Sequence, residues 1–125
     1  MAQDLRYTKE HEWVRVEGDQ AVVGITDYAA EQLGDIVFVE LPAVGRAVTQ
    51  FGSVGVIESV KAVSDLFSPV TGEVVETNPD LSGSPELVND DPFGKGWMLK
   101  IKLTDPGQVE SLLDEDAYEE LTRSA

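Results

Sequence analysis

The residue best suited to covalent chemistry in this sequence is Lys61, in the stretch VGVIESVKAVSDLF. Residues 47–94 hold no other basic side chain, and Glu58 and Asp65 flank the lysine at short range. Lysine combines a long, flexible stem with a terminal amine, so it can display a group that is carried on that amine. The pattern therefore fits either an attachment point for such a group or an ordinary solvated lysine at a bend.

The composition excludes several other kinds of chemistry. The chain has no cysteine, so disulfides, thiolate metal sites and a protein-borne redox pair are excluded, and sulfur redox chemistry must arrive on a cofactor. The single histidine, His11, argues against a histidine-built metal site or a Ser-His-Asp triad, and we expect it to be structural. The stretch NDDPFGKG lacks the alternating ligand spacing of a calcium loop, so we predict no metal site.

Length and charge narrow the class of protein. The 125 residues hold 24 acidic and 9 basic side chains, for a net charge of −15 at pH 7. This balance argues against nucleic-acid binding, and it suits either solubility or contact with basic partner surfaces. The chain is most simply one domain, residues 1–125, without an apolar run near the ~20 residues of a membrane helix. The N-terminus shows no signal or transit peptide, so we expect an intracellular protein unless a presequence was removed.

Short strand-like segments, rich in β-branched and aromatic residues, dominate the chain. They cover Glu12–Glu17 and residues 21–25, 35–42, 73–78 and 96–103. Gly18-Asp19 lies between the first two as a hairpin turn. Residues 78–96 are rich in Pro, Gly, Asn, Asp and Ser, which predicts an irregular surface segment. The excess of strands predicts a mainly β protein.

Helical signals occur in two places. Thr26 can cap a short helix over Asp27–Leu33, which Gly34 would end in a left-handed conformation. A helical tail is expected over about residues 105–123. Its apolar residues have the spacing of one helical face: Val109, Leu112, Leu113, Ala117 and Leu121. The two tryptophans, Trp13 and Trp97, are expected to pack in or near the core.

The segment that carries Lys61 fits two structures. Its apolar residues recur at intervals of four, three and four, as on one face of a helix. Its density of valine and isoleucine favours instead two strands, residues 52–59 and 62–67, joined by a bend at Val60-Lys61. Tight hairpin bends often need positive φ angles, which valine resists, so this hairpin would break a local rule at its tip. A broken local rule marks a candidate functional site.

Four sequence blocks occur in a fixed order: HEWV, GIT-Y-A--LGD-V-VELP, ESVKA-SD--SP--GEV and DP-G-GW. With the acidic tail LLDEDAYEEL they span nearly the whole chain, and in this order they resemble the H proteins of the glycine cleavage system. The resemblance implies a lipoyl/biotinyl-type barrel-sandwich hybrid of two small antiparallel sheets, with a few short peripheral helices and a C-terminal helix. The core would cover about residues 7–103, with the lysine on a tight turn.

The resemblance also implies a function, that of a lipoyl carrier without catalytic activity of its own. Lys61 would bear lipoate as an amide. A pyridoxal-phosphate glycine decarboxylase (P protein) would load an aminomethyl group on this arm, and an aminomethyltransferase (T protein) would pass the methylene to tetrahydrofolate. Dihydrolipoyl dehydrogenase (L protein) would then reoxidise the dithiol. Lipoate-attaching enzymes are further expected partners, whereas nucleic acid and membranes are not. We expect a monomer in the bacterial cytoplasm or, for a mature eukaryotic form, in the mitochondrial matrix.

Four further residues gain roles from the resemblance. Glu58 and Gly72 match positions that the family presents to lipoate-attaching enzymes, although alone they fit a solvated carboxylate and a turn glycine. Glu12 and Asp65 match positions that help hold the loaded arm in a surface cleft, where a carboxylate can pair with its cationic amine. Glu10 stands where the family often has serine, and we leave it outside the predicted site.

Other functions fit parts of the pattern. Biotin carriers typically show Met-Lys-Met at the tip, and lipoyl domains of 2-oxoacid dehydrogenases show Asp-Lys-Ala within longer chains, whereas this chain has Val60-Lys61-Ala62. An H-like protein that relays lipoate to other enzymes would share the lysine motif. An unmodified acidic scaffold would leave the lysine free.

Overall fold

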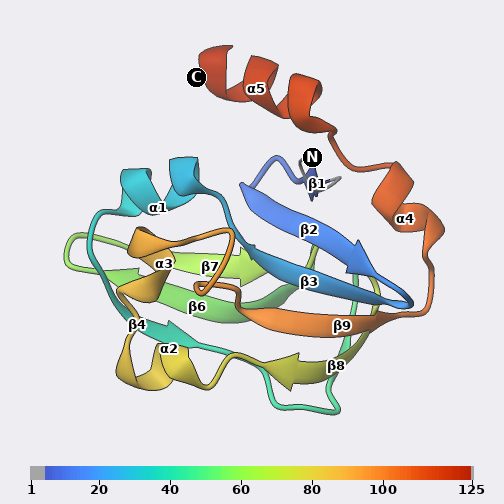
Figure 1. The fold of residues 1–125 in the computed structure, drawn as a ribbon, viewed down its shortest axis with the longest axis horizontal. Coiled ribbons are helices and arrows are strands. Elements are labelled where there is room, and N and C mark those ends of the chain that lie inside the picture. The colour runs from blue at the N-terminus through green and yellow to red at the C-terminus, as the bar shows by residue number, and fades with distance from the viewer. Residues whose placement is uncertain (1–4, 125) are drawn as a thin grey trace.

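The computed structural model describes residues 5–124, which form two antiparallel β-sheets (Figure 1). The strands are β1 (Leu5–Tyr7), β2 (Glu12–Glu17), β3 (Gln20–Ile25), β4 (Ile36–Glu40), β5 (Ala47–Val48), β6 (Ser53–Ser59), β7 (Val63–Phe67), β8 (Gly72–Thr77) and β9 (Leu99–Leu103). One sheet has the order β1-β2-β3-β9-β8-β5, and the other has the order β4-β6-β7. The predicted mainly β fold of two sheets is confirmed. The predictions of a single domain over residues 1–125 and of the character of the N-terminus include residues 1–4 and 125. These residues lie outside the part of the chain that the structure describes.

Five helices accompany the sheets in the described part of the chain. They are α1 (Asp27–Leu33), α2 (Asp80–Gly83), α3 (Leu87–Asp90), α4 (Gly107–Glu110) and α5 (Glu115–Ser124). The positions of both caps predicted for α1 are confirmed, but Gly34, with ψ −157°, does not adopt the predicted left-handed conformation. The Thr26 hydroxyl accepts a hydrogen bond from the Ala29 backbone, and Gly34, at φ 82°, donates its N–H to the carbonyl of Ala30. Within residues 5–124, no helix has the length and apolar character to cross a bilayer.

The main core lies between the two sheets. Its members with at most 2% exposure include Val14, Val23, Leu99 and Ile101 from the six-stranded sheet and Ile57 and Leu66 from the three-stranded sheet. Burying a side chain of this size stabilises a protein by about 1.5–3 kcal/mol. The β6–β7 hairpin therefore has a stiff base, because its inward residues are fixed in this core.

Two segments differ from the sequence predictions. Residues 78–96 are not wholly irregular, since α2 and α3 lie within them. The tail is not one helix, because Tyr7 and Leu113 exchange backbone hydrogen bonds of 2.8 and 2.9 Å that interrupt it between α4 and α5. The predicted helical face was therefore wrong. Ala117 is exposed, and Tyr118 is buried instead, stacked on Tyr7 with ring centroids 4.5 Å apart.

Candidate functional site

Lys61 lies in the short connection between β6 and β7, at one end of the three-stranded sheet (Figure 1). Ser59 closes this connection: its N–H donates to the carbonyl of Ala62 at 2.8 Å, and its hydroxyl accepts from the N–H groups of Lys61 and Ala62. Neither Val60 nor Lys61 has a positive φ. The predicted hairpin is confirmed, but the expected conflict at its tip was wrong, because serine makes the turn through its side chain.

The tip is attached to the C-terminal end of α1. The N–H of Val60 donates to the carbonyl of Asp35 at 3.0 Å. The stem of Lys61 passes so close to Gly34 that a Cβ on this glycine would lie 3.3 Å from the lysine Cε. Lys61 is nevertheless exposed, and among residues 5–124 no carboxylate lies within ion-pair distance of its amine. Glu58 and Asp65, its neighbours in sequence, therefore leave the amine accessible.

The outer face of the three-stranded sheet carries apolar and acidic side chains beside the tip. Two rows of paired residues cross it, Phe38–Glu58–Val63 next to the tip and Glu40–Val56–Asp65 beyond. Phe38 is 49% exposed and Val63 70%, and Val60 at the tip is 69% exposed. Glu58 thus lies between two exposed apolar residues, an arrangement suited to contact with another protein.

Glu12, the first residue of β2, is buried and connects the two sheets. One carboxyl oxygen accepts a hydrogen bond of 2.5 Å from the Thr8 hydroxyl, and the other accepts one of 3.2 Å from the backbone N–H of Phe67. Burial raises the pKa of Glu12 to about 7, although both hydrogen bonds oppose this effect. Its contact with β7 lies two residues beyond Asp65, about 20 Å along the strand direction from Lys61.

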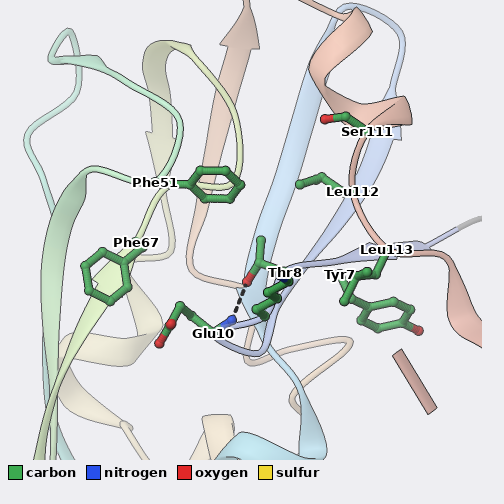
Figure 2. A pocket seen from close by; sticks show the side chains of 9 residues that line it. Tyr7, Thr8, Glu10, Phe51, Phe67, Ser111, Leu112 and Leu113 are labelled. Carbon is green, nitrogen blue, oxygen red and sulfur yellow. Dashed lines mark hydrogen bonds between the residues drawn. The ribbon is translucent and has the colours of Figure 1, made fainter. Parts of the chain in front are cut away.

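A cavity of about 480 Å³ opens where β7 ends (Figure 2). Phe51, Phe67 and Leu112 give it apolar walls, and Glu10 contributes a carboxylate at its edge. Thr8 also lines it, and its hydroxyl oxygen accepts from the N–H of Glu10 at 3.2 Å. Glu10, which the sequence prediction left outside the site, therefore lies in a cavity that adjoins the buried Glu12.

Gly72 lies apart from these residues. It opens β8 in the six-stranded sheet, and Figure 1 shows this strand beginning at the end of the molecule away from the β6–β7 connection. A Cβ on Gly72 would lie 2.0 Å from the carbonyl oxygen of Lys102 and 2.7 Å from the side chain of Ile101. The close approach of β8 to β9 thus requires glycine here, whatever Gly72 contributes to recognition.

His11 and the N-cap of α1 both contact the C-terminal helix through the hydroxyl of Tyr118. The Nδ1 of His11 lies 2.8 Å from the Tyr118 hydroxyl, which in turn lies 2.7 Å from the hydroxyl of Thr26, the N-cap of α1. Burial lowers the pKa of His11 and raises the pKa of Tyr118 to about 12. In the described part of the chain, no group of three or more acidic, histidine or cysteine side chains is arranged to hold a metal.

Sequence reasoning missed the roles of Ser59 and Phe38. A serine two residues before the lysine was a usable signal, since serine hydroxyls commonly bond to backbone groups in turns. Phe38 gave no such signal, because its place beside Glu58 depends on a pairing between β4 and β6 that is not local in sequence.

Together these features define a class of protein: a lipoyl/biotinyl-type barrel-sandwich hybrid that displays an exposed lysine at a hairpin tip. The family model described as glycine cleavage H-protein matches residues 5–125, so the chain belongs to the glycine cleavage H-protein family.

Individual relatives agree with this assignment. The chain is 62% identical over 116 residues to the glycine cleavage system H protein of Magnetococcus marinus, covering 93% of this chain and 83% of that protein. It is 57% identical over 120 residues to the H protein of Symbiobacterium thermophilum, covering 96% and 94%. The crystal structure of a glycine cleavage system H protein from Mycobacterium marinum superposes with a TM-score of 0.88, at 39% identity and over 98% of both chains.

Proposed function

We propose that this chain is the lipoyl carrier of the glycine cleavage system and that lipoate is attached to Lys61 as an amide. The observation that carries the proposal is an exposed, unpaired lysine at a braced hairpin tip in a member of the H-protein family. The surroundings fit the group, because Val60 and Val63 expose apolar side chains at and next to the hairpin tip. A bound dithiolane would supply the sulfur redox and group-carrying chemistry that a chain without cysteine lacks.

The hairpin holds the attachment point exposed at one end of the three-stranded sheet. Tethering replaces diffusion of a free cofactor by a high effective concentration at each partner. We propose that lipoate-attaching enzymes contact Glu58 within the row formed with Phe38 and Val63. Gly72 lies at the other end of the molecule, so its contribution to attachment would be indirect, through the packing of β8 on β9.

Glu12 and Asp65 are proposed to hold a protonated amine carried by the arm. Asp65 is exposed on β7, the strand that leads away from the tip, and Glu12 contacts the same strand at Phe67. A cation near Glu12 would lower its raised pKa and favour the carboxylate form. Each carboxylate oxygen can accept a second hydrogen bond, so Glu12 can bind the amine while it keeps its contacts within the chain.

The partners follow from the same proposal. They are the glycine decarboxylase (P protein), the aminomethyltransferase (T protein), dihydrolipoyl dehydrogenase (L protein) and the lipoate-attaching enzymes. The chain would act as their shared carrier and not as an enzyme. We expect a monomeric protein of the bacterial cytoplasm, in keeping with the bacterial relatives described above.

The test is glycine–bicarbonate exchange by the decarboxylase, with the lipoylated chain as carrier. Lys61→Ala and Lys61→Arg are expected to abolish exchange, because arginine keeps the charge but cannot form the amide. Lys95→Ala, at another exposed lysine, is the matched control and should retain exchange. Full exchange with Lys61→Ala would refute the proposal. Lipoylation of Lys61 without exchange would refute the role in glycine cleavage and favour lipoate relay.

A further inference from the structure

The segment 34–36 between α1 and β4 is held on both sides by one side chain from α3. The Nδ2 group of Asn89 donates to the carbonyl of Gly34 at 2.9 Å. Its Oδ1 accepts from the N–H of Ile36, also at 2.9 Å. Asn89 thus bridges the two residues that flank Asp35 and satisfies one backbone acceptor and one backbone donor.

Asp35 contacts the lysine tip through its backbone. Its carbonyl accepts the N–H of Val60, the residue before Lys61, at 3.0 Å. Gly34 lies under the stem of Lys61, and its φ of 82° is one that residues with a Cβ rarely adopt. The Asp35 carbonyl belongs to the same peptide group as the Ile36 N–H that Asn89 accepts. Asn89 therefore helps to set the direction of this carbonyl, together with the pairing of Ile36 with Ser59.

We propose that Asn89 is a positioning residue for the attachment of lipoate to Lys61. It acts through the carbonyl of Asp35, which holds Val60 and so sets the orientation in which the lysine leaves the hairpin. The inference rests on the proposed function only in taking Lys61 as the attachment point. Asn89 contacts the backbone on either side of Asp35 and is not itself a recognition residue.

The same part of the chain offers a matched control. Asn78 is buried, and its Nδ2 group donates to the carbonyls of Lys95 and Trp97, both at 2.8 Å. Its Oδ1 accepts from the N–H of Asp80. The Asn78 side chain therefore makes three backbone contacts, one more than that of Asn89, and all of them lie within residues 78–97. Its loss should lower stability without moving the tip.

The experiment compares Asn89→Ala, Asn89→Asp and Asn78→Ala in the complete apo-chain. Hydrogen exchange of the Val60 amide is measured by NMR, and the kcat and KM of lipoylation are measured with a lipoate–protein ligase, lipoate and ATP. For Asn89→Ala we expect Val60 exchange to be about tenfold faster, the usual effect of losing one hydrogen bond. We also expect a several-fold higher KM for the protein. Asn78→Ala should lower the melting temperature but keep the wild-type rate of Val60 exchange and the wild-type kcat and KM of lipoylation.

Asn89→Asp tests separately the hydrogen bond that Nδ2 donates to Gly34. It also serves as the second variant if Asn89→Ala does not fold. Its carboxylate keeps the acceptor for Ile36 but repels the carbonyl of Gly34. Acidification protonates this carboxyl group, so the protection of Val60 relative to wild type should recover as the pH falls. Equal effects of Asn89→Ala and Asn78→Ala, or wild-type behaviour of both Asn89 variants, would overturn the inference. A wild-type chain that the ligase does not modify would instead refute the proposed function, and Val60 exchange would still decide the role of Asn89.

Discussion

Replacing Glu12 by glutamine is expected to remove a pH dependence of the free energy of unfolding that arises from this one carboxyl group. Burial raises its pKa from an ordinary 4.5 to about 7 in the folded protein. Between these two values the folded state binds more protons than the unfolded state, so stability falls as the pH rises. At about 1.4 kcal/mol per pH unit, the interval corresponds to about 3 kcal/mol. This contribution is fully present below pH 4.5 and is lost once the pH has passed about 7.

The assay is urea unfolding between pH 4.5 and 8, followed by the fluorescence of the two tryptophans, of which Trp13 is fully buried in the folded protein. The wild type should lose about 3 kcal/mol more than Glu12→Gln over this range, since glutamine does not titrate. Glu40→Gln, at an exposed position on β4, is the control and should follow the wild type. Parallel curves for the wild type and Glu12→Gln would refute the assignment of a raised pKa to this buried carboxyl group.

Three further substitutions test the fold and the tip. Gly72→Ala places a Cβ 2.0 Å from the Lys102 carbonyl oxygen, so we expect at least about 3 kcal/mol of lost stability in thermal melts; a melt like the wild type's would contradict that packing. Tyr118→Phe removes the hydroxyl that contacts Thr26, which should cost about 1–2 kcal/mol in thermal melts; a melt like that of the wild type would contradict this contact. Ser59→Ala removes the hydroxyl that closes the hairpin. The free energy of unfolding in urea should fall by about 1 kcal/mol, and an unchanged value would contradict this role of Ser59.

The elements that depend on neighbouring residues could be predicted from the sequence. The Thr26 and Gly34 caps placed α1 at Asp27–Leu33, because both caps act within one helical turn. The strand β2 has the predicted bounds Glu12–Glu17, and the hairpin around Lys61 forms in spite of the helical spacing of its apolar residues. The strand propensity of this segment prevailed over its helical spacing. Both of its strands are paired in the three-stranded sheet.

The features that depend on distant residues could not be predicted. The break in the C-terminal tail comes from backbone bonds between Tyr7 and Leu113, which are far apart in sequence. The burial of Glu12, which is 1% exposed, gave no signal in the sequence, because its donors Thr8 and Phe67 are brought together only by the fold. The short helices α2 and α3 lie in a segment whose turn-forming residues gave no helical periodicity.

The proposed carrier function requires lipoate on Lys61, at the tip of the hairpin. The most direct test is mass spectrometry of peptides from the chain purified from its own cells. We expect one lipoyl group, on the peptide that contains Lys61, and none on the exposed lysines Lys9, Lys95 and Lys102. A free Lys61, or lipoate on another lysine, would contradict the proposal.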